Sequence, residues 1–230
     1  MVARLPWAQE VVGSNPAAPT SRNEGEMALL RDLCRQWVRR RGDEHHYTHL
    51  LAVWHDIGRR LPSSNAEADH HFLLWAIALA FFYKGQTDYP DDKSATDLTE
   101  ILGRCFQLDP GPAHDGAWEA VLNELDALPG VGIPRASVLL HCQFPEHFPI
   151  VDQRAAGALC GWAQHGMGWP LSVSPPSSKP VEMTQDARAY LDYRQALLAL
   201  VAASAGAMTL RDVELALYQA GPSGGAITGL

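Results

Sequence analysis

The sequence predicts an all-α protein in which residues 27–220 form one globular domain. Apolar side chains recur three and four residues apart in segment after segment, which is typical of amphipathic helices. No segment shows the alternation of apolar and polar residues that indicates a strand, and no internal repeat is present. The 230 residues are 47% hydrophobic, so the chain can bury a substantial core.

Three helices are expected in the first half of the domain. Residues 27–41 place leucine, tryptophan and valine at helical spacing and leave arginines on the outer face. The next helix, 46–61, ends at Pro62, because proline cannot continue a helix. The third helix, 66–83, follows Ser64 and Asn65, both of which suit the N-cap position.

Breaks rich in glycine and proline divide the second half of the domain. The helices expected there span 94–108, 117–128, a segment from about 133, the segment from Asp152 to Leu159, 186–205 and 210–220. Residues 161–180 are rich in Gly, Pro and Ser and predict a long loop. Residues 221–230 predict a flexible tail.

The first 26 residues are expected to be a disordered leader outside the fold. The stretch "VVGSNPAAPT" has no helical or strand period, and its Val-Gly-Ser-Asn-Pro back-translates to GGTTCGAATCC, the T-arm sequence of tRNA genes. We therefore expect translation to begin at Met27, inside a reading frame extended upstream into a tRNA gene. An ordinary disordered tail is the alternative.

The sequence favours a cytoplasmic protein. The longest apolar run, 72–83, is too short to span a bilayer, and no secretory signal is recognisable. The four cysteines are Cys34, Cys105, Cys142 and Cys160. Their spacing fits neither a zinc knuckle nor an iron–sulfur cluster, so we expect free thiols in a reducing compartment.

The charge of the chain argues against a strong nonspecific nucleic-acid binder. The net charge is −8, and residues 111–160 carry only 2 basic but 6 acidic side chains. Phosphate affinity normally comes from lysine and arginine. Any nucleic-acid contact must therefore use other donors.

The stretch "LPGVG", 128–132, predicts a tight hairpin between two helices. Gly130 and Gly132 allow dihedrals that other residues avoid, and Pro134 fits the first turn of a helix that begins near Ile133. The N–H groups at the start of that helix would be free, so the tip could hold a phosphate without a lysine. An ordinary glycine-rich helix connection is the alternative.

Leu-Pro-Gly-Val-Gly, the small-residue apolar helix after it, and Val-Asp at 151–152 together resemble the helix-hairpin-helix DNA glycosylases of the endonuclease III superfamily. The resemblance covers 117–161, and the last helices are similar to those of bacterial relatives that lack an iron–sulfur cluster. It implies a monomeric base-excision-repair hydrolase that binds double-stranded DNA and releases a damaged or mismatched base.

The resemblance also assigns roles to the hairpin. In this family the hairpin grips the DNA backbone, and the matching residues are Leu128, Gly130, Val131, Gly132 and Arg135. The family holds a monovalent cation on backbone carbonyl oxygens, here those of Asp126, Leu128 and Val131, and the cation bridges to a phosphate. No other cofactor is implied.

Asp152 matches the essential aspartate of the family, 18 residues after Pro134. The resemblance places it at the mouth of the pocket that receives a flipped base. There it would stabilise positive charge on the sugar or activate water. The alternative is a plain N-cap, a position that aspartate suits.

The chain departs from the family in three places. Bifunctional members carry a Schiff-base lysine where this chain has Pro134, and the neighbouring Arg135 stays protonated and cannot replace it. We therefore expect a monofunctional enzyme. A C-terminal four-cysteine cluster is missing. Gln86 in "GQTD" echoes a glutamine that fills the gap left by the flipped base, but it lies too few residues before the hairpin.

Three other interpretations stay open. "HDIG" at 55–58 resembles the metal-binding signature of HD phosphohydrolases, although the upstream histidines are too close to it. A non-catalytic relative could keep the hairpin for DNA binding alone. Trp162 and Trp169 could stack on a base or pack in the core.

Overall fold

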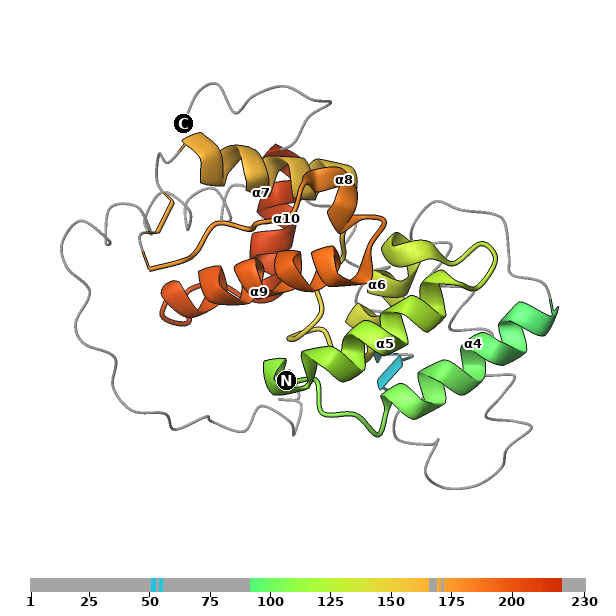
Figure 1. Cartoon of the computed structure of the whole chain (residues 1–230). Helices are drawn as coiled ribbons and strands as arrows, with labels where there is room; N and C mark the ends of the chain where they lie inside the picture. The colour runs from blue at the N-terminus through green and yellow to red at the C-terminus, as the bar shows by residue number, and fades with distance from the viewer. Residues whose placement is uncertain (1–50, 53, 56–91, 166–168, 171, 221–230) are drawn as a thin grey trace.

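The computed structural model describes residues 51–52, 54–55, 92–165, 169–170 and 172–220, and within them it confirms the all-α prediction (Figure 1). The elements are α4 (Asp92–Cys105), the 3₁₀ helix η2 (Pro112–His114), α5 (Asp115–Asp126), α6 (Gly132–Gln143), α7 (Gln153–His165), α8 (Pro180–Met183), α9 (Ala187–Ala203) and α10 (Leu210–Ala220). The described residues contain no strand.

Helices α4, α5 and α6 form one part of the fold, with α5 packed against both of the others. The sequence of α5 explains its central place. Trp118, Val121, Leu122 and Leu125 recur at helical spacing, and all four are buried. The ring of Trp118 also packs against Phe148, with 4.6 Å between the ring centroids.

Helices α7 to α10 form the other part. Helix α10 packs against α7 and α9, and the short α8 packs against the same two helices. Helix α9 also contacts α5, so it joins the two parts of the fold (Figure 1). Its buried residues lie on most of its circumference and include Tyr190, Tyr193 and Arg194.

Several predicted boundaries are confirmed to within two residues. Helix α10 spans the predicted 210–220, and α9 lies within the predicted 186–205. Asp186 caps α9, because its side chain accepts a hydrogen bond from the N–H of Ala189 at 2.8 Å. The predicted helix 117–128 is shifted: α5 begins and ends two residues earlier.

The loop expected after Leu159 is partly wrong. Helix α7 continues to His165 through Gly161, and the half-buried Trp162 and Ala163 pack against the core in this added turn. Helix α8 was also not predicted. It starts at Pro180, a favourable first residue, and the carboxylate of Glu182 accepts the N–H of Lys179 at 2.8 Å.

Among the described residues, no helix is both long and apolar enough to cross a bilayer. Three of the predicted free thiols, Cys105, Cys142 and Cys160, are buried and unbridged. The leader 1–26, the helices predicted at 27–41 and 66–83, and the tail 221–230 lie outside the described residues.

Candidate functional site

The hairpin connects the end of α5 at Asp126 to the start of α6 at Gly132. Gly130 has φ +78° and Gly132 has φ +62°. Both values lie in the left-handed region that L side chains rarely adopt, so the glycines are required by the turn. Between them, the N–H of Val131 donates to the carbonyl oxygen of Leu128 at 3.1 Å and closes the turn.

The tip of the hairpin is less open than the sequence predicted. The N–H of Ile133, expected to be free, donates to the carboxylate Oδ1 of Asp126 at 3.1 Å. This carboxylate caps α6 and places negative charge at the helix N-terminus, where it also opposes a bound anion. The N–H groups of Gly130 and Gly132 have no acceptor among the described residues. They are therefore the backbone donors left for a ligand.

Arg135 adds positive charge at this tip. Its Nη1 lies 3.3 Å from the point where a Cβ on Gly130 would stand. The guanidinium therefore folds back over the glycine instead of extending away from the hairpin. The tip thus presents two N–H groups and one guanidinium, which are donors that an anion could use without a lysine.

If the hairpin tip binds duplex DNA, as the sequence resemblance implies, replacing Gly130 by aspartate should weaken that binding by at least about tenfold at low salt, because a carboxylate would then face a DNA phosphate. Gly130→Asn is the matched control, since asparagine has the same size and tolerates positive φ about as well. Gly132→Asp should act in the same direction. Equal affinity of Gly130→Asp and Gly130→Asn in a fluorescence-anisotropy titration would remove the hairpin from the binding surface.

Asp152 occupies the N-cap of α7, as the cap interpretation predicted. Its Oδ1 accepts the N–H of Ala155 at 2.8 Å, and its carbonyl oxygen accepts the N–H of Ala156 at 3.0 Å. The residue is only half-buried. The second carboxylate oxygen has no hydrogen-bond partner among the described residues, so the cap leaves one oxygen for other chemistry.

An open cleft of about 530 Å³ lies at Asp152. It is lined by Pro134, Asp152, Gln153, Arg154, Thr184, Gln185 and Tyr218. The cleft thus joins the first turn of α6, the first turn of α7, the end of α8 and the last turns of α10. Of the hairpin residues assigned to DNA contact, none lines it; Pro134 is the nearest point of the hairpin helix.

The cleft wall combines a cation with an aromatic ring. The guanidinium carbon of Arg154 lies 5.7 Å from the centroid of the Tyr218 ring. Tyr218 is 39% exposed, one of the two large apolar side chains that the described surface exposes most. An exposed aromatic face beside an arginine can stack on a planar group and hold a neighbouring anion.

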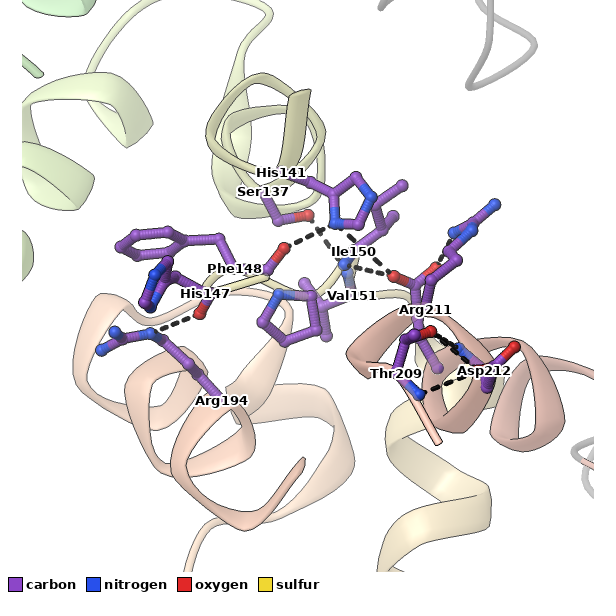
Figure 2. A network of polar contacts seen from close by, with 12 residues as sticks. Ser137, His141, His147, Phe148, Ile150, Val151, Arg194, Thr209, Arg211 and Asp212 are labelled. Atoms are coloured by element: carbon purple, nitrogen blue, oxygen red, sulfur yellow. Dashed lines mark hydrogen bonds and ion pairs between the residues drawn. The ribbon is translucent and has the colours of Figure 1, made fainter. Parts of the chain in front are cut away.

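Buried side chains fix the segment that leads to Asp152. Four consecutive carbonyl oxygens of this segment, which we call the strap (residues 147–151), accept hydrogen bonds from α6 and α9. Figure 2 shows the two bonds from Arg194 and His141. The pairs are Arg194 Nε to His147 (2.7 Å), His141 Nδ1 to Phe148 (2.6 Å), Tyr190 to Pro149 (2.8 Å) and Tyr193 to Ile150 (3.4 Å). Burial raises the pKa of both tyrosines, which keeps them protonated as donors.

The amides of the strap are held as well. The N–H of Ile150 donates to Glu214 Oε2 at 2.9 Å, and the N–H of Val151 donates to Ser137 Oγ at 3.1 Å (Figure 2). Glu214 is itself paired with Arg211 one turn earlier in α10. Both acceptors are buried. The backbone before Asp152 is therefore held by side chains from three helices.

Comparison of the chain with known protein families, with curated proteins and with solved structures finds no match. The features of the candidate site are therefore those of its geometry. That geometry brings Asp152 and Pro134 into one cleft, and it holds the glycines and Arg135 at the hairpin tip.

Other predicted candidates take different places. Trp169 is buried and donates through its Nε1 to the carbonyl oxygen of Val173 at 2.7 Å, so the core-packing interpretation is confirmed for it. The rings of Trp162 and Trp169 pack in an edge-to-face arrangement, with 5.0 Å between their centroids. Of the HD signature only His55 is described, and Gln86 lies outside the described residues. No group of three or more His, Cys, Asp or Glu side chains in the described part of the chain could hold a metal.

The stability of the fold should depend on pH because His141, which binds the strap, is buried. This ring is fully buried, and burial lowers its pKa from 6.5 to about 3, helped by the positive charge of Arg211. Between pH 6.5 and pH 3 the unfolded chain binds a proton that the folded chain does not. The free energy of unfolding should therefore fall as the pH drops, by up to about 1.4 kcal/mol per pH unit.

The variant His141→Asn tests this sign, because it keeps an N–H donor for Phe148 but cannot titrate. We expect a smaller decrease in Tm between pH 7 and pH 5 than in the wild type, whatever the Tm at pH 7. Parallel Tm curves for the two proteins would show that folding does not change the pKa of His141.

Proposed function

We propose that the chain is a monofunctional DNA N-glycosylase of the helix-hairpin-helix type. The observation that carries this proposal is the cleft in which the half-buried carboxylate of Asp152 lies beside the first turn of the hairpin helix. A phosphate held at the hairpin tip would keep the duplex backbone next to this cleft. A base flipped from that duplex would then enter the cleft.

Asp152 supplies the chemistry in this proposal. As the N-glycosidic bond breaks, its electron pair leaves with the base and positive charge develops on the sugar. The carboxylate oxygen not used by the N–H of Ala155 stabilises that charge. Water then adds at C1′ and transfers its proton to Asp152, which leaves an intact abasic site.

The walls of the cleft suit a nucleotide. The ring of Tyr218 offers a stacking face, and Arg154 offers a charge for a phosphate next to the base. Gln185 brings amide donors and acceptors to the same cleft. These groups can bind an extruded nucleotide around Asp152.

Pro134 supports hydrolysis without a lyase step. A lyase needs an amine that attacks C1′ and forms an imine, and proline has no side-chain nitrogen at this place in the cleft. Lys179, the lysine whose side chain is described, does not line the cleft; its Nζ lies 3.4 Å from Glu182. The side chains of Lys84 and Lys93 are outside the described residues.

A monovalent cation fits the hairpin in this proposal. The carbonyl oxygens of Asp126, Leu128 and Val131 would hold it. The carbonyl of Leu128 accepts one N–H, which leaves one lone pair, and the carboxylate of Asp126 adds negative charge in the same turn. The cation would offset this charge and supply an electrostatic contact to a phosphate.

The test is a panel of duplex oligonucleotides, each with one damaged or mismatched base, incubated with the full chain. We expect release of the free base from at least one duplex, an unbroken abasic strand, and no protein–DNA adduct after borohydride. An adduct mapped to Lys84, Lys93 or Lys179 would contradict the monofunctional mechanism.

The second candidate is a non-catalytic DNA-binding protein with the same hairpin. One observation favours it: Asp152 forms a regular N-cap, which needs no catalytic role. Duplex binding without base release from any member of the panel would select this candidate.

A further inference from the structure

One buried hydroxyl links the hairpin helix to the residue before Asp152. Ser137 lies one turn after Pro134 in α6 and is fully buried. Its Oγ donates to the carbonyl oxygen of Pro134 at 2.8 Å and accepts the N–H of Val151 at 3.1 Å. Figure 2 shows this contact between the hydroxyl and the strap.

Both ends of this bridge lead to the cleft. Pro134 lines the cleft directly, and Val151 precedes Asp152, which also lines it. The hydroxyl of Ser137 therefore connects the first turn of α6 directly to the residue before Asp152. A side chain in this place must both donate and accept a hydrogen bond, and an alanine could do neither.

We propose that Ser137 is the positioning residue for Asp152. Its hydroxyl fixes the position of the strap relative to α6. The distance between DNA bound at the hairpin and the carboxylate of Asp152 in the cleft is thereby kept constant. This inference rests on the proposed function for its catalytic consequence. Its structural part, the control of the Asp152 cap by Ser137, stands on the geometry alone.

The chain contains a matched control in Ser204. This residue is also buried, its Oγ donates to the carbonyl oxygen of Val201 at 2.6 Å, and it accepts the N–H of Met208 at 3.2 Å. The donor–acceptor pattern equals that of Ser137, but the bridge closes the turn between α9 and α10. Ser137→Ala and Ser204→Ala remove the same group from two different places.

Amide hydrogen exchange of the full chain tests the structural part, without need of a substrate. Ser137→Ala should speed the exchange of the N–H groups of Val151 and Ala155 about tenfold relative to Ser204→Ala. The N–H of Ala155 reports on Asp152, because it donates to that carboxylate. Ser137→Thr, which restores a hydroxyl, should return exchange toward the wild-type rate.

The catalytic consequence is read on a substrate that the wild type cleaves. Ser137→Ala should slow single-turnover base release about tenfold and leave the Kd for abasic duplex within a factor of two, whereas Ser204→Ala changes neither. Equal exchange and equal release in the two alanine variants would overturn the proposal. If the wild type releases no base, the proposed function fails, and the exchange rates still decide whether Ser137 positions Asp152.

Discussion

Asp152→Asn is expected to lower the rate of base release by about 100-fold or more while duplex binding and Tm stay near wild type. Asparagine keeps the size of the side chain and an oxygen that can accept the N–H of Ala155, so the cap of α7 survives. It lacks the negative charge that, in the proposed mechanism, stabilises the developing positive charge on the sugar. Release is measured in a single turnover, and binding is measured on abasic duplex.

Asp186→Asn is the matched control, because Asp186 caps α9 with the same geometry. Its carboxylate accepts the N–H of Ala189 at 2.8 Å, the same distance as in the cap of α7. Asp186 does not line the cleft. Equal rates of base release in the two variants would show that Asp152 acts only as a helix cap.

Arg194→Met is expected to lower the free energy of unfolding by about 3–5 kcal/mol, the largest stability effect predicted for a single residue here. Arg194 is fully buried in α9. Its guanidinium is paired with Asp115, donates to the carbonyl oxygens of Pro110 and His147, and lies 4.5 Å from the centroid of the Phe148 ring. Methionine fills similar space but leaves the buried Asp115 without its counter-charge.

The same helix provides the control for Arg194. Arg188 is exposed and pairs with Glu119 at 3.5 Å, so Arg188→Met should change the free energy of unfolding by less than about 1 kcal/mol. Urea titrations followed by circular dichroism give both values. Similar losses in the two variants would show that the buried contacts of Arg194 stabilise the fold no more than the exposed Arg188–Glu119 pair does.

The hairpin and the Asp152 cap could be predicted because their signals are local. The turn in "LPGVG" depends on the backbone dihedrals of its two glycines and on no distant residue. Both glycines have the positive φ that the turn requires. Asp152 could be placed at a helix start because an N-cap bonds to an amide three residues away. Helix α10 has a clear apolar period between a loop and the tail.

The strap could not be predicted, because its partners are far apart in the sequence. Ile150 is 64 residues from Glu214, and His147 is 47 residues from Arg194. Charged residues in a helical pattern are normally assigned to the solvent face, whereas Arg194 and Glu214 lie in the core. Nothing in the sequence around Tyr190, Tyr193 and His141 indicates that all three side chains bind carbonyl oxygens of the same segment.

The hairpin prediction was incomplete for a related reason. The sequence indicated free N–H groups at the start of α6 but gave no sign that the side chain of Asp126 turns toward Ile133. A cap supplied seven residues earlier depends on the turn between the two helices. The cleft likewise depends on four elements that only the folded chain brings together.

The most direct test of a catalytic Asp152 compares two duplexes that carry no base at the target position. One contains a neutral tetrahydrofuran abasic analogue, and the other contains a pyrrolidine whose protonated nitrogen mimics the positive charge of the transition state. We expect the wild type and Asp186→Asn to bind the pyrrolidine duplex about tenfold or more tightly, and Asp152→Asn to bind both alike. Equal affinities in the wild type, or a preference that persists in Asp152→Asn, would contradict the proposed role of the carboxylate.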